Sequence, residues 1–270
     1  MDAESRLLSV IERFESAVVA YSGGVDSTVV AAAAHRVLGD GRMQAVIGVS
    51  PSVARSEVEA AFRVARVAGF PIRTVATNEL SDTRYVANEP SRCYFCKSEL
   101  YSVLDRVRQA CSFEVVMDGF NRDDVGDFRP GAKAGQEHRV VSPLKEAGLG
   151  KEAVRAVARK WRLPNAEKPA SPCLASRIPY HTRVTVTDLK QVEEAEAALH
   201  RLGLTEVRVR HHDSVARIEV PANKIAMVVE NREAIVDAVK KAGYQFATVD
   251  LAGLKSGGFN TFLNEKMLLQ

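Results

Sequence analysis

The stretch Ser22-Gly23-Gly24-Val25-Asp26-Ser27 combines two adjacent glycines with two hydroxyl donors. A short apolar run precedes it and a helix-like run over residues 28–37 follows, which gives the order strand, glycine-rich turn, helix. Glycines let the backbone approach a ligand closely, and N–H groups at a helix N-terminus bind anions. The stretch has neither the ending of a Walker A loop nor the spacing of a dinucleotide fingerprint. A cradle of this kind suits a pyrophosphate and predicts ATP chemistry; an ordinary tight turn is the alternative.

Three of the four cysteines lie where a thiol could do chemistry. Cys93 and Cys96 form a C-x-x-C pair, and Cys173 lies in a loop with prolines on both sides. From spacing alone, a zinc site, a redox dithiol, a reactive nucleophile and an iron–sulfur cluster all remain open. Cys111 ends a helix-like run before a strand, and we expect it to be a small buried apolar residue.

Strands and helices alternate over the first two-thirds of the chain. Strands separated by helices predict an α/β domain with a parallel sheet and helices on both faces, which we place at residues 1–180. Ligands of such sheets bind beyond the carboxyl ends of the strands, where the glycine-rich turn begins. The expected strands are 17–21, 43–49, 72–76 and 114–117, and the expected helices are 56–69, 98–110 and 150–161.

The pattern changes after Tyr180. A helix over 187–202, strands over 206–212 and 215–220, a mostly helical stretch over 221–243 and a strand over 245–251 predict a small α+β domain at residues 181–270. Alternation along the first of these strands puts Arg208 and Arg210 on one face, where two guanidiniums could grip a phosphate. An exposed charged strand face is the alternative interpretation.

The composition is that of an ordinary enzyme, with 46% hydrophobic and 26% charged residues. A formal charge of +3 makes no strong case for nucleic-acid binding. No apolar run approaches the roughly 20 residues that span a membrane, and the N-terminus lacks the order of a signal peptide. We therefore expect a cytoplasmic protein without a membrane partner. Four cysteines in a reducing compartment favour metal binding or catalysis over disulfides.

Further loops follow the glycine-rich turn in a characteristic order: 118–124, 127–131, 142–144 and Pro172-Cys173-Leu174-Ala175-Ser176-Arg177. The turn resembles the PP-loop of the ATP pyrophosphatase superfamily, whose members cleave ATP to AMP and pyrophosphate. Together with these loops it resembles the LarE family, the ATP-dependent sulfur transferases of nickel-pincer nucleotide synthesis. The resemblance runs from about residue 15 to residue 260, and the cysteine loop is its most family-specific part.

The resemblance implies a specific reaction. The family adenylates the carboxylates of a pyridinium-3,5-dicarboxylate mononucleotide, and a cysteine-derived sulfur then displaces AMP to give thiocarboxylates. In one branch the cysteine that matches Cys173 gives up its own sulfur. Another branch carries a [4Fe-4S] cluster on three cysteines that relays sulfide, and the trio Cys93, Cys96 and Cys173 favours this second branch. The resemblance also implies a sulfide or other sulfur donor, a downstream nickel-inserting enzyme and a homo-hexamer.

Site residues follow from the same resemblance. ATP is expected on the PP-loop, with its adenine against backbone groups of the second strand. Asp26, Asp123 and Asp124 are candidates to hold Mg²⁺, and Arg129 is a candidate phosphate contact. Without the resemblance, the two aspartates of the later loop would be read as a solvated turn, and Arg129 as a surface charge. The substrate-binding candidates are Arg208 and Arg210, for the ribose phosphate, and Glu196, near the active cysteine.

Three other functions compete with this interpretation. A tRNA thiolase with a [4Fe-4S] cluster also pairs a PP-loop with three cysteines, but it would need a basic surface for the RNA backbone. An ammonia-using amidotransferase similar to NAD synthase would leave the cysteines without a role. A non-catalytic nucleotide sensor would leave the loop around Cys173 unexplained.

Overall fold

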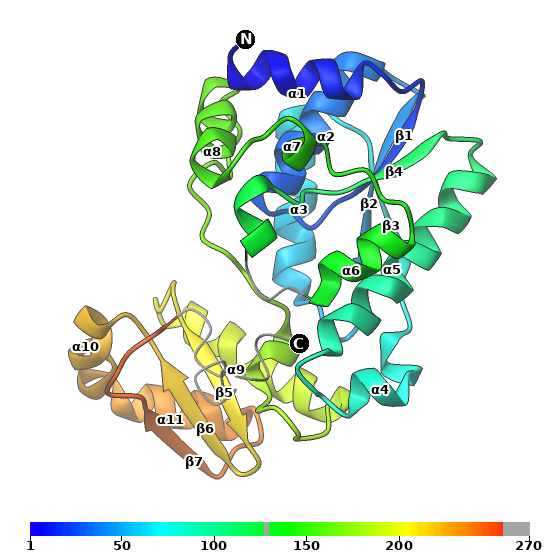
Figure 1. Ribbon diagram of the computed structural model, residues 1–270. Helices are drawn as coiled ribbons and strands as arrows, with labels where there is room; N and C mark the ends of the chain where they lie inside the picture. Colours follow the sequence, from blue (N-terminus) through cyan, green and yellow to red (C-terminus); the bar gives the residue numbers. More distant parts are fainter. Residues whose placement is uncertain (127–129, 256–270) are drawn as a thin grey trace. The chain divides into compact units, whose positions relative to one another are not determined.

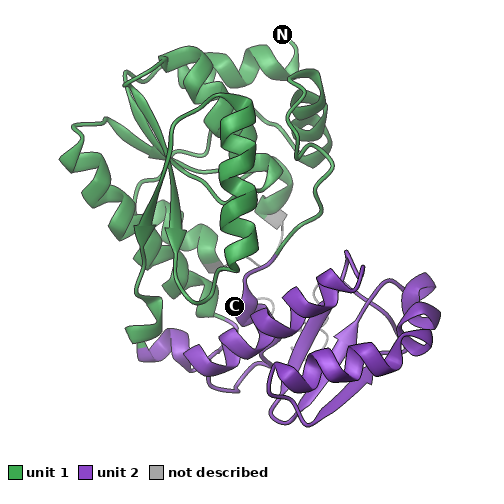
Figure 2. Cartoon of the chain, turned by 180° about the vertical axis from the view of Figure 1, so that it is seen from behind, with its two compact units in different colours: residues 1–82, 91–171 green, residues 83–90, 172–270 purple. Residues whose placement is uncertain are grey.

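The computed structural model describes residues 1–126 and 130–255 of the chain. These residues form two compact units, which Figure 2 colours separately. Among the described residues, the first unit contains 1–82, 91–126 and 130–171, and the second contains 83–90 and 172–255. The division after Ser171 lies before the predicted boundary near residue 180, and the inclusion of 83–90 in the second unit had no counterpart in the prediction.

The first unit is built on a four-stranded sheet in the order β3-β2-β1-β4 (Figure 1). All three strand pairs are parallel, which confirms the predicted sheet. The inner strand β1 is buried along its whole length, as expected of a strand covered on both faces. The strands are β1 (Ala17–Ala20), β2 (Met43–Val49), β3 (Ile72–Ala76) and β4 (Val115–Met117).

Alternate residues of β1 pack into two separate cores, one on each face of the sheet. Ala17 and Val19 pack with α1, α2 and α8, whereas Val18 and Ala20 pack with α5 and α6. Helices therefore cover both faces, as predicted. The helices of this unit are α1 (Ala3–Ile11), α2 (Val25–Leu38), α3 (Arg55–Ala68), α5 (Arg92–Ala110), α6 (Pro130–Glu137), α7 (Pro143–Glu146) and α8 (Lys151–Lys160), with the short turns η1 (Glu79–Ser81) and η2 (Arg122–Gly126).

The order in which the chain adds strands to the sheet reverses between β1 and β4. The chain adds β2 and β3 on one side of β1 and then returns to place β4 on the other side. Such a switch point opens a crevice at the carboxyl ends of the strands, where ligands bind. The loops after β1 and β4 meet there. Their close approach is shown at Gly119, where an added Cβ would lie 2.8 Å from the Ser27 nitrogen. The PP-loop and the loop 118–124 therefore share this edge.

The second unit is a three-stranded sheet with helices, as the predicted α+β domain requires. β5 pairs with β6 antiparallel and β6 pairs with β7 parallel. Val209 and Ile218 share a core with residues of α9 and α11. The elements are α4 (Thr83–Val86), η3 (Leu174–Arg177), α9 (Val186–Arg201), β5 (Arg208–His212), β6 (Val215–Glu219), η4 (Ala222–Lys224), α10 (Ile225–Glu230), α11 (Arg232–Lys241) and β7 (Phe246–Val249).

One helix differs from its prediction in a way that concerns the cysteines. α5 begins at Arg92 rather than at residue 98, so it contains the C-x-x-C pair. The segment Arg92–Lys97 mixes aromatic, charged and cysteine residues without an apolar period, which explains why the pattern did not extend the helix. Residues three apart on a helix share a face, so Cys93 and Cys96 lie on the same side of its first two turns.

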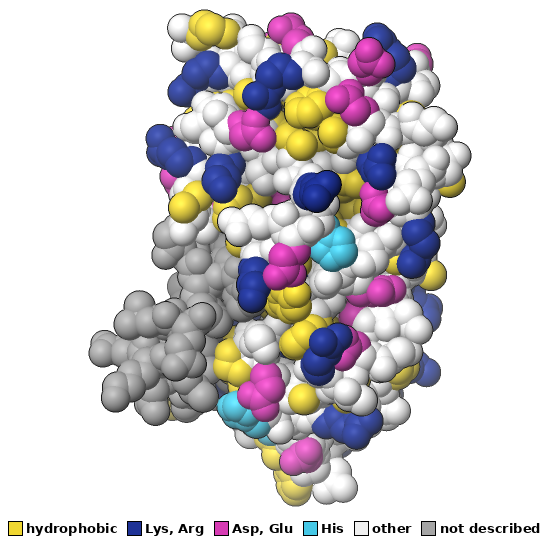
Figure 3. Space-filling model, turned by 45° about the vertical axis from the view of Figure 1, so that its right-hand side comes forward, with side chains coloured by type: hydrophobic (Ala, Val, Ile, Leu, Met, Phe, Trp, Pro, Cys, Tyr) yellow, Lys and Arg dark blue, Asp and Glu magenta, His cyan; other side chains and the backbone are white. Residues whose placement is uncertain are grey.

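The surface carries charges of both signs. On the face drawn in Figure 3, lysine and arginine side chains are interspersed with aspartate and glutamate rather than gathered into a patch of one sign. Within the ranges that the structure describes, no helix is long and apolar enough to cross a membrane.

Two features restrict Gly23 to glycine, its positive φ and its close approach to α3, and alanine substitutions can measure the cost of each. Its φ is +74°, and an added Cβ would lie 2.9 Å from the Cβ of Ala61 on α3. Gly39 has a similar φ of +75°, but an added Cβ would meet nothing within 4 Å. We expect Gly39→Ala to cost about 1 kcal/mol in the free energy of unfolding, from the left-handed backbone alone.

Gly23→Ala should cost more than its control and should also weaken nucleotide binding, because the loop must move away from α3. Denaturant unfolding and ATP titration of both variants would check this. Equal effects of the two substitutions would contradict the close approach of the loop to α3.

Candidate functional site

The PP-loop presents backbone N–H groups at the start of α2. Gly24 is the N-cap of this helix and has no side chain with which to cap it, so the first turn is left open toward a ligand. Asp26 lies in that first turn. The positive end of the helix dipole and the N–H groups of this turn together favour a phosphate. The order of strand, glycine turn and helix is the one that the sequence predicted, and phosphate binding by the loop stays a prediction.

Hydroxyl groups fix the shape of the loop. The Ser22 and Ser27 Oγ atoms lie 3.1 Å apart, and the Ser22 N–H donates to Ser27 Oγ at 3.2 Å. Ser27 Oγ also reaches the Gly24 carbonyl at 3.1 Å. Ser27 is buried and Ser22 is exposed. The two serines thus hold the loop closed on itself, and only Ser22 presents its side chain to solvent.

The loop after β4 is tied to the PP-loop by Asn121, which is fully buried. Its amide donates to Asp26 Oδ2 at 3.2 Å, and its carbonyl oxygen accepts from the Asp123 N–H at 2.9 Å. At the base of the same loop, Asp118 accepts from the Tyr101 hydroxyl and the Ser142 hydroxyl, each at 2.8 Å. Burial and the neighbouring Asp118 charge raise the pKa of Tyr101, so this hydroxyl stays a donor.

Asp123 and Asp124 are engaged with the protein. Asp123 accepts from the Lys151 N–H at 2.8 Å at the start of α8, and this hydrogen bond, followed by Arg122, lowers the pKa of its carboxyl. Asp124 is buried and pairs with the Lys151 ammonium at 3.6 Å. Of the three predicted Mg²⁺ candidates, Asp26 is therefore the one that lies on the PP-loop itself. Arg129 lies outside the described residues.

The three cysteines of the predicted cluster divide between the two units. Cys93 is exposed and Cys96 half-buried on α5 of the first unit, whereas Cys173 is half-buried and belongs to the second. Nowhere in residues 1–126 and 130–255 do three His, Cys, Asp or Glu side chains form a group that could hold a metal ion. The expectation for Cys111 is wrong: it is exposed at the end of α5, 3.6 Å from the Arg73 guanidinium.

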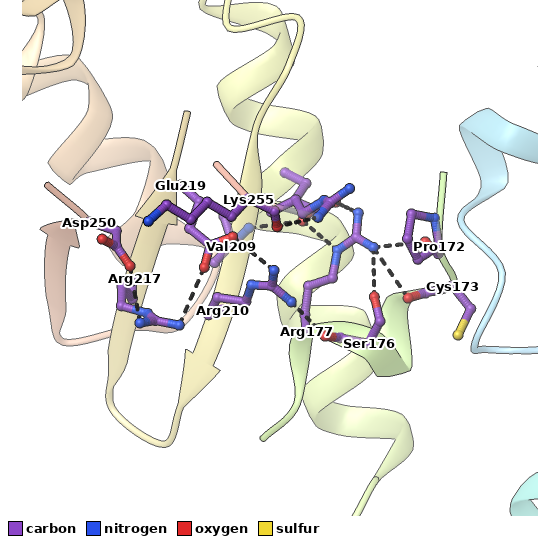
Figure 4. Close-up of polar contacts among 12 residues, drawn as sticks. Pro172, Cys173, Ser176, Arg177, Val209, Arg210, Arg217, Glu219, Asp250 and Lys255 are labelled. Carbon is purple, nitrogen blue, oxygen red and sulfur yellow. Dashed lines mark hydrogen bonds and ion pairs between the residues drawn. The ribbon is translucent and has the colours of Figure 1, made fainter. Parts of the chain in front are cut away.

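Arg177 holds the backbone around Cys173. Its Nη1 donates to the carbonyl of Pro172 at 2.7 Å and to that of Cys173 at 3.3 Å. Its Nε and Nη2 bind the two oxygens of Glu196 at 2.9 and 3.1 Å, in a bidentate pair that is buried. Figure 4 shows the Cys173 sulfur directed away from this guanidinium. Glu196 thus acts on the cysteine loop through Arg177, and the sequence did not indicate this pairing.

Arg208 and Arg210 lie beside Arg177, and they differ in how they are bound. Arg210 is buried, pairs with Glu219 at 2.8 Å and donates to the Ser176 carbonyl at 2.8 Å (Figure 4). Arg208 donates to the Lys255 carbonyl at 3.3 Å and, among the described residues, forms no ion pair. Burial, followed by the charges of Arg177 and Arg210, lowers the pKa of Arg208. An anion at Arg208 would relieve that repulsion.

The chain has relatives in several organisms. A family model for NAD synthase matches residues 9–115. An uncharacterised protein of Synechocystis is 41% identical over 267 residues, which cover 97% of this chain and 99% of the relative. The pyridinium-3,5-bisthiocarboxylic acid mononucleotide synthase of Lactiplantibacillus plantarum is 34% identical over 265 residues, which cover 98% and 96% of the two chains. An uncharacterised protein of Methanocaldococcus jannaschii is 24% identical over 234 residues, 87% and 88% of the two chains.

The parallel sheet, the open glycine loop at the start of α2 and the NAD synthase match define an enzyme of the PP-loop ATP pyrophosphatase class. Within that class, the similarity to the L. plantarum synthase extends over nearly the whole of both chains. The chain belongs to the family of this synthase, the LarE family.

Glu196→Gln tests how the cysteine loop is held. Breaking a buried pair by removing one charge typically costs about 3–5 kcal/mol in the free energy of unfolding, because the remaining charge stays buried without its counterion. We expect Glu196→Gln to lower the free energy of unfolding by an amount approaching this range. We also expect faster alkylation of Cys173, because its loop loosens. Glu194→Gln on the exposed face of α9 is the matched control, and it should change stability by less than about 0.5 kcal/mol. An alkylation rate unchanged by Glu196→Gln would contradict this role.

Proposed function

We propose that this protein converts the carboxylates of pyridinium-3,5-dicarboxylate mononucleotide into thiocarboxylates for nickel-pincer cofactor synthesis. ATP activates each carboxylate, and a cysteine-derived sulfur then replaces AMP. The observation that carries the proposal is the open PP-loop at the β1–β4 switch point, in a chain 34% identical to a synthase named for the bisthiocarboxylic acid product. The fold supports ATP as the activating substrate.

The loop explains why ATP can serve here. A carboxylate is a poor acyl donor, because oxide would have to leave; attack by its oxygen on the ATP α-phosphate gives an acyl adenylate with AMP as leaving group. Pyrophosphate departs in that step, and N–H groups already aimed at its oxygens stabilise the developing charge. Asp26, in the first turn of α2, would hold Mg²⁺, which screens the phosphate charge when bound.

The sulfur step is assigned to Cys173. Its thiolate attacks the acyl carbon of the adenylate, a thioester forms and AMP leaves. Removal of the Cys173 Cα proton by a base then breaks the Cβ–S bond, which leaves dehydroalanine in the chain and the thiocarboxylate on the product. Arg177 prepares this loop by fixing the carbonyls of Pro172 and Cys173.

The cluster route has partial support from the chain. Cys93 and Cys96 share a helix face in the first unit, and Cys173 belongs to the second unit. Three thiolates can hold a [4Fe-4S] cluster with one iron open to sulfide. Because no three-ligand group occurs in the described part of the chain, we derive no step through a cluster.

Arg208 is the residue that we expect to contact the phosphate of the substrate. A nucleotide substrate carries a ribose phosphate, and Arg208 is the arginine of its cluster without a carboxylate partner among the described residues. Arg177 and Arg210, each already bound to a glutamate, would set the local potential. We assign Arg208 as the direct phosphate contact and Arg210 as its support. A homo-hexamer, a sulfur donor and a nickel-inserting partner complete the proposal, on the family resemblance alone.

Mass spectrometry after anaerobic incubation with MgATP, sulfide and the dicarboxylate mononucleotide tests the proposal. We expect AMP and a thiocarboxylate from the wild type and from Cys111→Ser. Cys173→Ser should release AMP by hydrolysis of the adenylate but should form no thiocarboxylate. Full thiocarboxylate formation by Cys173→Ser would contradict the proposal, and thiolation of tRNA instead of the mononucleotide would favour the rival enzyme.

The same experiment separates the two sulfur routes. Loss of the elements of hydrogen sulfide from the intact chain at Cys173, with undiminished single-turnover product in Cys93→Ser and Cys96→Ser, would establish the sacrificial route. An unchanged chain mass with many turnovers, and loss of both iron and product in Cys93→Ser and Cys96→Ser, would establish the cluster route.

A further inference from the structure

Asn165 is buried behind the PP-loop and contacts it directly. Only 5% of its surface is exposed, and it lies on the segment 162–168 that follows α8. Its Nδ2 donates to the Gly23 carbonyl at 3.0 Å and to the Thr28 hydroxyl at 2.8 Å. The sequence pattern gave no sign of this residue, because a lone asparagine after a proline is typical of any turn.

The partners fix which way the amide of Asn165 points. The Gly23 carbonyl can only accept, and the Thr28 hydroxyl donates its hydrogen to the Gly24 carbonyl at 2.8 Å. Both atoms therefore require a donor, so the NH₂ group must face the loop. Its Oδ1 is buried and has no hydrogen-bond partner among the described residues. Both hydrogens of this amide are thus used to hold the PP-loop.

The hydrogen bonds that the Gly23 and Gly24 carbonyls accept set the directions of the two N–H groups that follow them in the loop. A peptide group is planar, with its C=O and N–H in opposite directions. Asn165 draws the Gly23 carbonyl inward, so the Gly24 N–H points outward, where it makes a long 3.4 Å contact with Ser22 Oγ. The Gly24 carbonyl accepts the first backbone hydrogen bond of α2, from the Thr28 N–H at 3.0 Å, and also that of the Thr28 hydroxyl, which Asn165 contacts, so the Val25 N–H points outward with the start of the helix. Both N–H groups face the position where phosphate is expected.

Asn165 is itself held rigidly. The Arg155 guanidinium of α8 donates to the carbonyls of Ala166 at 2.6 Å and Lys168 at 3.0 Å. The Lys168 ammonium reaches Glu57 on α3 at 2.5 Å. The segment is therefore held directly after the asparagine, and it continues toward Pro172 and Cys173 along the chain.

We propose that Asn165 is a positioning residue for the PP-loop: it directs the Gly24 N–H group toward a phosphate of ATP, it supports the start of α2 through Thr28, and it links pyrophosphate occupancy to the segment that leads to the loop of Cys173. This inference rests on the proposed use of the loop for ATP. Asn165 touches neither substrate nor reacting atoms. Its effect is therefore on ligands that carry a pyrophosphate and not on AMP.

Equilibrium titrations with ATP, pyrophosphate and AMP test the inference. In Asn165→Asp the oxygen facing Gly23 can no longer donate, and in Asn165→Ala both bonds are lost. We expect the Kd for ATP and for pyrophosphate to rise about tenfold in either variant, with the Kd for AMP unchanged. Thr28→Val, which removes one partner and keeps the shape, should shift the same two constants by less.

Two controls separate positioning from general destabilisation. Leu7→Ala removes a fully buried side chain of α1 in the same unit, so it should lower the melting temperature without changing either Kd. In hydrogen–deuterium exchange, pyrophosphate should slow exchange over 162–171 in the wild type and not in Asn165→Ala. Unchanged ATP and pyrophosphate affinities in Asn165→Asp and Asn165→Ala would overturn the inference alone. Absence of ATP binding by the wild type would overturn the proposed function with it.

Discussion

The direction of the Gly23–Gly24 and Gly24–Val25 peptide groups is the constraint on which the site depends. A phosphate can be held by backbone only if successive N–H groups point the same way; here Asn165 draws the Gly23 carbonyl inward, and the N–H and hydroxyl of Thr28 hold the Gly24 carbonyl. The strands supply the platform, because the loop starts where β1 ends and rests on α3 through Gly23. Asn121 joins the loop after β4 to Asp26 at the same sheet edge. The chemistry of the first unit therefore follows from backbone geometry that its neighbours enforce.

Buried charge organises the second unit. Arg177 and Arg210 each pair with a glutamate, and each also donates to a backbone carbonyl of the stretch 172–177. Such pairs add little net stability, since desolvation offsets their attraction, but they specify one arrangement of the groups that they join. Here that arrangement fixes the backbone beside Cys173 and leaves Arg208 with positive neighbours and no carboxylate partner among the described residues. One cluster thus holds the loop of Cys173 and, in the proposed function, would bind the substrate phosphate through Arg208.

The sequence predicted the parallel sheet, the α+β unit and the PP-loop, because apolar strands between amphipathic helices and a glycine turn are local signals. It missed the start of α5 at Arg92, since that segment has no apolar period. It named Asp123 as a candidate to hold Mg²⁺ but did not indicate that this carboxylate accepts a hydrogen bond from the first N–H of α8. The contacts of Asn165 with Gly23 and of Arg177 with Glu196 could not be found from pattern, because the partners lie far apart in the sequence. Local secondary structure can be predicted from the sequence, whereas polar contacts between distant residues can be identified only once the fold is known.

Isotope exchange between pyrophosphate and ATP tests the central claim most directly, because it reports formation of the acyl adenylate before any sulfur is transferred. The measurement uses the wild-type protein with Mg²⁺, ATP, labelled pyrophosphate and the dicarboxylate mononucleotide, in the absence of sulfide, with Cys173→Ser in parallel. We expect label to enter ATP in both proteins, and only when the mononucleotide is present. No exchange in either protein, although both bind ATP, would contradict carboxylate adenylation at this PP-loop.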